Sequence, residues 1–204
     1  MRVISLDDGR AYPLLADLLL ARNARKDAEL SEEKLQSLLQ ENSLKTCLEA
    51  AIAALSRRAM AQTELRRFLL SRKHAPAAVD NALAECLRLT LLNDADYAAM
   101  YAADMAARGM GRRRILQTLA RRGIAREMAD SACENLEDEK GTTDGGEEQR
   151  ARELLAKKCR PINRERVDPK KLRAKLARFL YARGYPADLS FRIIDEYLRH
   201  PDVE

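Results

Sequence analysis

The chain of 204 residues has no tryptophan, and it has only three phenylalanines, six tyrosines, eight glycines and six prolines. Alanine, leucine, arginine and glutamate dominate instead, and these residues are strong helix formers. The few glycines and prolines fall mainly between runs of periodic apolar residues, where they punctuate helices. The composition therefore predicts an all-α protein, with one exception at the N-terminus.

Long apolar segments are also lacking. No run approaches the roughly 20 apolar residues that a membrane-spanning helix needs. The first ten residues, MRVISLDDGR, contain neither an apolar core nor a small-residue cleavage site, so a secretory signal is not expected. The sequence predicts a cytoplasmic protein.

Cysteine pairs with metal-ligand spacing are absent. Cys47, Cys86, Cys133 and Cys159 are isolated and never form CxxC. In a helical context we expect them to pack as small apolar residues and not to pair or bind metal. No metal and no cofactor are predicted, and a reducing compartment fits this pattern.

Catalytic constellations are missing as well. The two histidines, His74 and His200, have no serine or cysteine partner at a recognisable spacing, and no GxxxxGK[ST] phosphate loop is present. Asp94 and Asp96 have the position of first-turn acids at a helix N-terminus, which is a stabilising role. No catalytic residue is assigned, and an enzyme is not predicted.

Positive charge is unevenly spread along the chain, whose net charge is +5. Residues 1–50 carry seven Lys/Arg against nine Asp/Glu, residues 51–147 carry 15 against 14, and residues 148–204 carry 15 against nine. The excess therefore lies in the C-terminal quarter, which suggests an anionic partner for that part.

Three similar blocks follow one another at residues 63–87, 113–136 and 174–198. Each has an apolar pair four residues apart and an arginine three residues later, and the three sets are Leu65, Leu69, Arg72; Ile115, Leu119, Arg122; and Leu176, Leu180, Arg183. Gly123 and Gly184 come next in two blocks, as expected at a left-handed residue after a helix, whereas Lys73 takes that place in the first. Met128 and Leu189 are expected to face inward on the helix that follows. A further helix precedes each block, so the repeating unit has three helices.

The N-terminal region reads differently. Asp8-Gly9 between short apolar runs predicts a small two-stranded hairpin over residues 2–15, with a frayed tail as the alternative. Ser31 is expected to cap a helix over residues 31–40, and a second helix is expected to start at Ser43.

The predicted organisation is three tandem three-helix repeats in an elongated, curved array. The boundaries are a leader at 1–42, repeat 1 at 43–92, repeat 2 at 93–137, a linker at 138–148 and repeat 3 at 149–204. The linker segment is acidic and glycine-rich, and we interpret it as flexible, so that the third repeat can move. Small stacked units of this kind form a binding surface and not a catalytic cavity.

Cationic side chains recur at equivalent places and are the candidate contact residues. On a helix, Arg114 and Arg121 lie seven residues apart and share a face, as do Arg66 and Lys73. Such a face can meet phosphates or an acidic protein surface, although a solvated face balanced by neighbouring acids is the alternative. The candidates are Arg57, Arg58, Arg66, Arg67, Arg72, Arg112, Arg113, Arg114, Arg121, Arg122, Lys171, Lys175, Arg178 and Arg183.

Tyr97 is the one aromatic candidate. It lies four residues from Tyr101, which in turn lies four residues from Met105, all on one predicted helix. A stacking platform for bases is one interpretation. A core stripe with one exposed tyrosine is the other.

These motifs resemble the RecX family of regulatory proteins. The run Leu91-Leu92-Asn93-Asp94-Ala95-Asp96-Tyr97-Ala98, continued by Gly111, Ile115, Leu119 and Arg122-Gly123-Ile124, is similar to the central signature of that family. The first signature of the family is similar to Leu55-Ser56-Arg57-Arg58 with Glu64-Leu65. Its last signature is similar to the stretch from Asp168 through Tyr185. The chain departs at Ala61, where the family often has a capping serine, and at Lys73, where it usually has glycine.

The resemblance implies a non-enzymatic protein that binds RecA, chiefly as its filament on DNA, and modulates it, mostly by inhibition. It implies repeats that contact successive RecA protomers along the filament groove, with effects on recombinase, ATPase and coprotease activities in DNA repair and the SOS response. We expect a monomer, with weak non-specific DNA binding as an accessory property. Two alternatives stay open: an autonomous helix-turn-helix-like DNA-binding regulator, and a protein-interaction scaffold without nucleic-acid contact.

Overall fold

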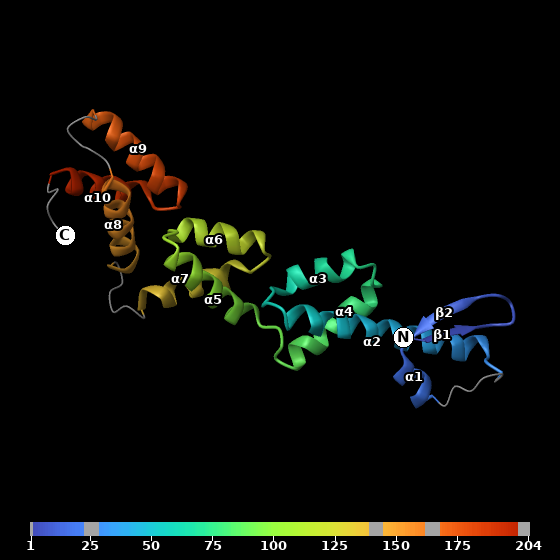
Figure 1. The fold of residues 1–204 in the computed structure, drawn as a ribbon. Coiled ribbons are helices and arrows are strands. Elements are labelled where there is room, and N and C mark those ends of the chain that lie inside the picture. The colour runs from blue at the N-terminus through green and yellow to red at the C-terminus, as the bar shows by residue number, and fades with distance from the viewer. Residues whose placement is uncertain (1, 23–28, 139–144, 162–167, 200–204) are drawn as a thin grey trace. The chain divides into compact units, whose positions relative to one another are not determined.

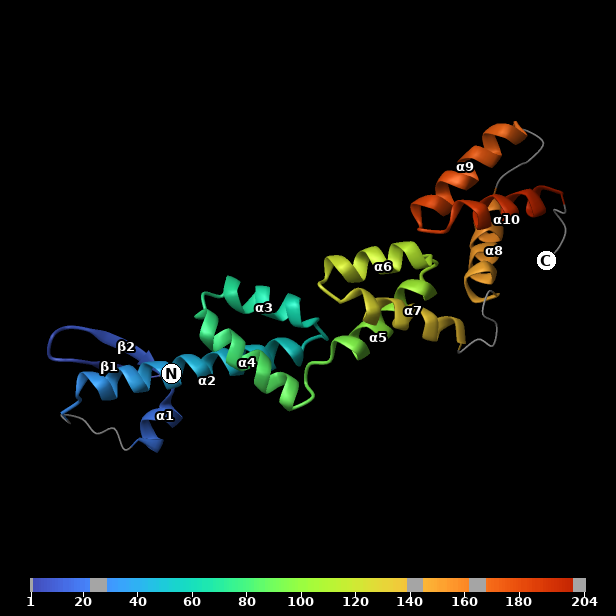
Figure 2. The same ribbon diagram turned by 180° about the vertical axis from the view of Figure 1, so that it is seen from behind.

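The computed structural model describes residues 2–22, 29–138, 145–161 and 168–199, and the chain divides into two compact units between Asn93 and Asp94 (Figures 1 and 2). The first unit contains strands β1 (Arg2–Ser5) and β2 (Ala11–Leu14) and helices α1 (Ala16–Ala21), α2 (Glu32–Leu55), α3 (Gln62–Ser71) and α4 (Pro76–Arg88). The second contains α5 (Asp94–Ala107), α6 (Arg112–Arg121), α7 (Arg126–Asp138), α8 (Gly145–Cys159), α9 (Pro169–Ala182) and α10 (Ala187–Arg199). The predicted fold class of three-helix units behind an N-terminal hairpin is confirmed.

The hairpin forms where the Asp-Gly signal places it. β1 and β2 are antiparallel, with Arg2 opposite Leu14 and Ser5 opposite Ala11, and Gly9 takes the left-handed turn conformation at φ 85°. A two-stranded ribbon is marginal alone in water. Here Leu14 and, on α1, Leu18 are fully buried, so the ribbon is supported by apolar packing within the first unit.

The first long helix differs from the prediction of two helices. Ser31 caps α2 as expected, accepting a hydrogen bond from the Lys34 N–H at 3.3 Å, but the helix continues without a break to Leu55. The start expected at Ser43 is therefore wrong. Asn42, next to the expected start, has a tertiary contact instead: its side chain accepts the Leu15 N–H at 2.8 Å and thereby ties the hairpin segment to mid-helix.

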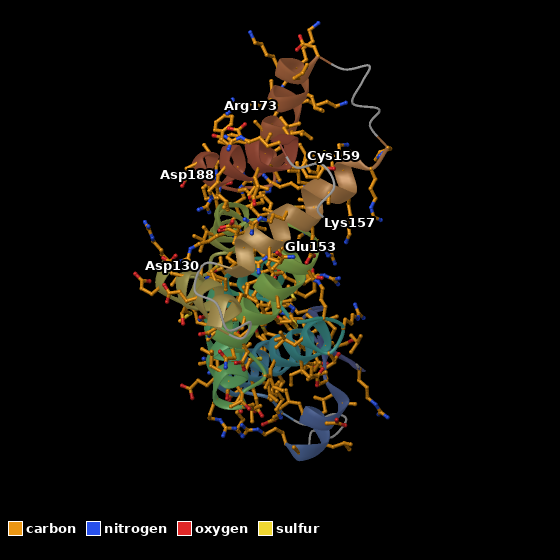
Figure 3. All side chains as sticks on the ribbon, turned by 90° about the vertical axis from the view of Figure 1, so that its left-hand side faces the viewer. Asp130, Glu153, Lys157, Cys159, Arg173 and Asp188 are labelled. Carbon is orange, nitrogen blue, oxygen red and sulfur yellow. The ribbon has the colours of Figure 1, made fainter. Side chains whose placement is uncertain are left out.

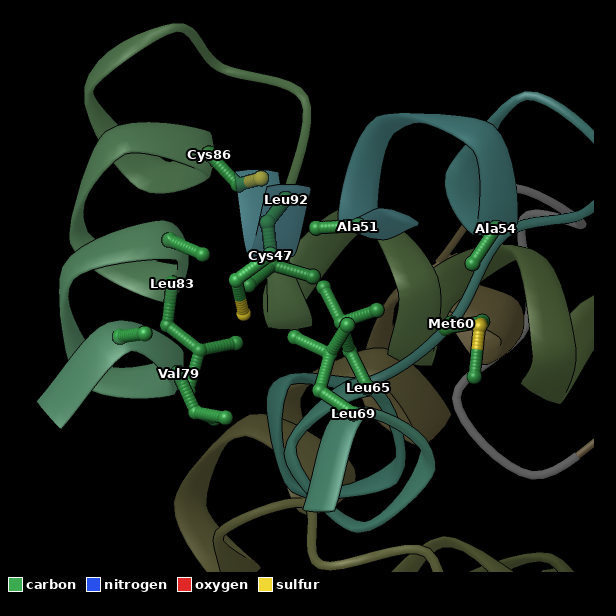
Figure 4. Packing of buried hydrophobic residues seen from close by; sticks show 12 residues of the cluster. Cys47, Ala51, Ala54, Met60, Leu65, Leu69, Val79, Leu83, Cys86 and Leu92 are labelled. Atoms are coloured by element: carbon green, nitrogen blue, oxygen red, sulfur yellow. The ribbon is translucent and has the colours of Figure 1, made fainter. Parts of the chain in front are cut away.

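Helices α2, α3 and α4 form repeat 1 around one apolar cluster (Figure 4). Leu65 and Leu69 of α3 are fully buried there, and so are Cys47 of α2 and Cys86 of α4. Burial raises the pKa of both thiols, which keeps them protonated and unreactive. The expectation that these cysteines pack as small apolar residues is confirmed, and Cys133 and Cys159 are buried too.

Helices α5, α6 and α7 form repeat 2, whose core is rich in alanine. Ile115 and Leu119 of α6 are at most 1% exposed, and most of the other buried residues of repeat 2 are alanines of α5 and α7. Met128, expected to face inward, is 43% exposed, because Ala129, Ala132 and Cys133 form the buried side of α7. That expectation is wrong.

Helices α8, α9 and α10 form repeat 3 around Leu176, Leu180 and the fully buried Tyr185. The helix ends repeat the pattern read from the sequence, since Gly123 and Gly184 lie at φ 85° and 93° after α6 and α9. Lys73 takes the same left-handed place after α3, at φ 65°.

The segment interpreted as a linker is shorter than expected. Helix α8 begins at Gly145, so residues 145–148 are helical, while residues 139–144 lie outside the described part of the chain. Repeats 2 and 3 belong to one compact unit and share direct hydrogen bonds. The interpretation that the linker lets the third repeat move stays a prediction.

Candidate cationic interface

The free face of α6 carries three of the predicted arginines. At 100° per residue, Arg113, Arg114 and Arg121 lie on the side of α6 opposite Ile115 and Leu119, and all three are exposed. Within the described residues, none of the three forms an ion pair within 4.0 Å. Arg114 and Arg121 thus share one exposed face, as their spacing predicts, and contact of this face with a partner stays a prediction.

The arginine triplet 112–114 is divided by the fold. Arg112 turns toward α7, where its Nη2 lies 3.0 Å from Asp130 Oδ1 and 3.7 Å from Glu134 Oε1 (Figure 3 labels Asp130). Its side chain is 29% exposed. A partly buried pair of this kind holds α6 against α7, so Arg112 is part of the scaffold whereas its two neighbours face outward.

Arg113 also makes a contact that reaches the next repeat. Its guanidinium carbon lies 4.1 Å from the ring centroid of Tyr181 on α9, and Tyr181 is 53% exposed. A cation–π contact at an exposed site contributes about 0.5–1 kcal/mol. Both residues remain exposed in this contact, and Tyr181 was not among the residues predicted from the sequence.

Helix α9 presents a second cationic face at the equivalent position. Lys171, Lys175 and Arg178 follow the i, i+4, i+7 spacing and are all exposed. In the described part of the chain the two lysines have no ion pair, and Arg178 Nε donates only to the Ala174 carbonyl at 3.3 Å. Repeats 2 and 3 therefore repeat both the fold and the charge of their second helix.

Other cations of repeat 3 are neutralised locally. Arg173 donates two hydrogen bonds to Asp195, at 2.6 and 2.9 Å, and lies over Phe191 at 4.7 Å (Figure 3 labels Arg173). The guanidinium lowers the pKa of the Asp195 carboxyl. This pair packs α9 against α10 and leaves the opposite face of α9 to Lys171 and Lys175.

Repeat 1 has a weaker version of this face. Arg66 pairs with Asp80, and Arg58 donates to Glu64 Oε1 at 2.8 Å. Arg57 and Arg67 remain exposed, and within the described residues neither forms an ion pair. The candidate residues of the first repeat therefore contribute fewer uncompensated charges than those of α6 and α9.

The arginine that ends the second helix of each repeat has a structural role. Arg72 lies 5.1 Å from the ring of Phe68, Arg122 lies 4.4 Å from that of Tyr101, and Arg183 lies 4.9 Å from that of Phe179. The i, i+4 spacing of the first and third pairs could have predicted these contacts. The second pair joins two helices and has no local signal.

Tyr97 lies in the core of repeat 2. The side chain is 5% exposed, its hydroxyl accepts a hydrogen bond from Arg122 Nη1 at 2.6 Å, and its ring stacks on Tyr101 at 5.9 Å. The structure thus brings Tyr97 and Arg122 together but away from the free face of α6.

Repeats 2 and 3 meet at the ends of these cationic helices. The Gly111 N–H donates to the Arg183 carbonyl at 2.9 Å, and Arg183 Nη1 donates to the Arg108 carbonyl at 3.1 Å. The carboxylate of Glu147, on α8, accepts the Arg112 N–H at 2.7 Å. Because Gly111 offers no capping side chain, Glu147 supplies the N-terminal cap of α6 from the next repeat, an interaction worth about 0.5–2 kcal/mol in other proteins.

Within the described ranges, no group of three His, Cys, Asp or Glu side chains is placed to hold a metal ion. In that part of the chain, no helix is both long and apolar enough to cross a membrane.

The fold and these faces define a class: tandem three-helix repeat proteins that present cationic helices. The profile of the second three-helix domain of RecX matches residues 93–132, and that of the third matches residues 146–194. The regulatory protein RecX of Amycolatopsis mediterranei is 30% identical over 165 residues, covering 80% of this chain and 90% of the relative. The chain belongs to the RecX family, as the sequence motifs indicate.

More distant relatives agree over almost the whole chain. The regulatory protein RecX of Clostridium beijerinckii is 26% identical over 193 residues, which covers 95% of this chain and 87% of that protein. A crystal structure of a regulatory protein RecX aligns with a TM-score of 0.71 at 21% identity, over 95% of this chain and 92% of that one. The crystal structure of RecX from Lactobacillus salivarius aligns with a TM-score of 0.65 at 21% identity, over 76% of this chain and 97% of that one. These structures support the fold.

Proposed function

We propose that this protein binds RecA, chiefly as its filament on DNA, and inhibits the recombinase, ATPase and coprotease activities of RecA in DNA repair and the SOS response. Membership of the RecX family carries the proposal, since the relatives are named regulatory proteins. The protein acts without catalysis or a cofactor, as a cytoplasmic monomer. Its three repeats, at 43–92, 93–137 and 149–204, are the contact units.

The contact surface in this proposal consists of the free faces of α6 and α9. Arg113, Arg114 and Arg121 on α6 meet acidic side chains of RecA or DNA phosphates, and Lys171, Lys175 and Arg178 on α9 do the same. Uncompensated exposed charges support this assignment, because an ion pair already made within the chain adds little to binding. Arg57 and Arg67 extend the surface in repeat 1. Arg58, Arg66, Arg72, Arg112, Arg122 and Arg183 act through the scaffold, as does Tyr97.

The decisive experiment is the ATPase activity of RecA on single-stranded DNA with this protein titrated in. We expect progressive inhibition, and no change at a several-fold excess over filament protomers would overturn the proposal. The triple variant Arg113→Ala, Arg114→Ala and Arg121→Ala should bind the filament at least about tenfold more weakly, since each lost charged contact costs roughly 0.5–1.5 kcal/mol.

A matched control separates the site from overall charge. The triple variant Arg10→Ala, Arg88→Ala and Arg126→Ala removes the same charge from exposed arginines that already pair with acids of this chain. It should inhibit RecA almost as well as the unsubstituted protein. Equal loss in both triple variants would show that net charge, and not the α6 face, governs binding.

Binding to DNA alone distinguishes the two alternatives. A sequence-specific band shift without RecA would favour an autonomous DNA-binding regulator, whereas weak, salt-sensitive and sequence-blind binding would fit the proposal. If DNA neither binds the protein nor strengthens its binding to RecA, a scaffold without nucleic-acid contact is favoured.

A further inference from the structure

The contact between repeats 2 and 3 is built from backbone as much as from side chains. Gly111 and Gly184 are both buried, and a Cβ atom on Gly111 would lie 2.8 Å from the carbonyl carbon and oxygen of Gly184. A Cβ atom on Gly184 would lie 2.5 Å from Cβ of Arg114 and would also overlap its backbone nitrogen. Real Cβ atoms do not approach backbone this closely, so the two turns touch only because both residues are glycine.

The same contact places hydrogen-bond partners at helix ends of the neighbouring repeat. The first N–H groups and last carbonyls of a helix lack intrahelical partners. The Arg183 carbonyl, at the end of α9, accepts from Gly111, while its guanidinium donates to the Arg108 carbonyl at the end of α5. Glu147 accepts from the first N–H of α6 at 2.7 Å. Each of these three bonds also places a charge or dipole of opposite sign against a helix terminus.

This set of residues, Gly111, Glu147, Arg183 and Gly184, lies directly beside the charged faces. Arg113 and Arg114 of the α6 face follow Gly111 within three residues, and Arg113 contacts Tyr181 on α9 at 4.1 Å. Any rotation of one repeat against the other would therefore change the spacing between the cations of α6 and those of α9.

We propose that Gly111, Glu147, Arg183 and Gly184 form a rigid inter-repeat joint, which holds the cationic faces of α6 and α9 in one fixed arrangement. The four residues are positioning residues: they act on a partner through the two helices that they join. The significance of the joint for RecA rests on the proposed function, whereas its rigidity is a property of the protein alone.

The distance between two spin labels, measured by pulsed electron paramagnetic resonance, tests the rigidity of the joint without RecA. Labels at Gln117→Cys on α6 and Ala174→Cys on α9 occupy exposed sites, and the four native cysteines are buried and should label slowly. The chain without the two added cysteines measures that background. We expect a single narrow distance distribution, and a broad one would overturn the proposal.

Substitutions at the joint should broaden that distribution while helicity and the thermal transition of the first unit are retained. Gly184→Ala introduces the overlap with Arg114, and Glu147→Ala removes the cap of α6 without adding atoms. Glu147→Gln keeps an oxygen that accepts the Arg112 N–H and should restore the narrow peak. A narrow peak in both alanine variants would contradict the joint.

Gly123→Ala is the matched control for backbone strain. Gly123 has nearly the same φ as Gly184, 85° against 93°, but it is exposed. The Gly123→Ala substitution should lower the stability of the protein without changing the distance distribution.

If the joint proves rigid but the protein has no effect on RecA, the proposed function fails and the joint stands. If RecA is inhibited equally by Glu147→Ala, the joint is not needed for that activity.

Discussion

At the scale of single residues, Tyr185 shows that the core of repeat 3 accommodates a buried hydroxyl without a hydrogen-bond partner among the described residues. Its side chain is fully buried, and its hydroxyl has no hydrogen-bond partner among the described residues. Burial raises the pKa of Tyr185 to about 12, from an ordinary value of 10.0. The ring contributes apolar packing, while the unpaired hydroxyl lowers the stability that this packing would give alone.

Tyr185→Phe should therefore leave the second unit as stable as before or more stable by about 1 kcal/mol, because an unpaired buried hydroxyl is removed. The neutral phenol is favoured in the folded state, so the contribution of Tyr185 is present below pH 10 and is lost as the pH rises toward 12. Urea unfolding from pH 8 to 11.5 should show this alkaline loss in the parent and less of it in Tyr185→Phe. Tyr12→Phe, which leaves Tyr185 in place, should retain the loss. A clear drop in stability at neutral pH in Tyr185→Phe would contradict this account.

The apolar residues of the site's scaffold could be predicted from the sequence, but the partners of its charges could not. Ile115 and Leu119 follow from helical spacing alone. Arg112 finds Asp130 18 residues away and Glu147 35 residues away, and no local pattern encodes either contact. The three adjacent arginines therefore read as one cluster, although the fold separates Arg112 from the other two.

At the scale of helices, the turn after the second helix of each repeat is decided by one left-handed residue. Gly123 and Gly184 adopt it without steric cost, whereas Lys73 adopts it at φ 65° despite its Cβ atom. A left-handed conformation costs a non-glycine residue roughly 1–2 kcal/mol. The missing glycine of the first repeat is thus a local source of strain.

Lys73→Gly should stabilise the first unit by about 0.5–1 kcal/mol, because relief of strain exceeds the entropy that glycine loses on folding and the modest loss of a cation near a helix C-terminus. The midpoint of urea unfolding measures the change. Gly123→Lys is the reverse exchange and should destabilise by a similar amount. If Lys73→Gly has no effect or lowers the midpoint, the strain at residue 73 is already compensated.

Helix existence was easier to predict than helix extent. Ser31 marks a true start, because capping acts locally. The start expected at Ser43 fails because Asn42 serves a contact 27 residues away, with the Leu15 N–H. Helix boundaries set by tertiary contacts have no signature within one turn of the chain.

At the scale of the whole molecule, the buried clusters belong to separate parts. The buried residues of the cluster around Leu65 and Leu69 lie within 47–92, and those of the cluster around Leu176 and Leu180 lie within 151–194. Repeat proteins of this kind gain stability from each repeat and from its neighbouring interface. The free energy of local unfolding should therefore differ from repeat to repeat along the chain.

Leu65→Ala and Leu176→Ala each remove a fully buried side chain and should cost about 2–5 kcal/mol locally. Native-state hydrogen exchange should show Leu65→Ala accelerating amides of α2 to α4 and Leu176→Ala accelerating those of α8 to α10. Ile52→Ala, at a 40% exposed position, is the mild control. Uniform acceleration of the whole chain by either variant would show global cooperativity instead.

Helix α2 has a consequence for any attempt to shorten this protein. Its 24 residues span about 36 Å at 1.5 Å per residue. The N-terminal half buries Leu35 and Leu38 and carries the Asn42 contact to the hairpin segment, while the C-terminal half supplies Cys47 and Ala51 to repeat 1. Deletion of the first 42 residues would therefore cut through a helix and not through a hinge, and would leave repeat 1 with an uncapped, fraying end. A deletion variant that loses activity reports on this damage before it reports on any binding role of the N-terminal segment.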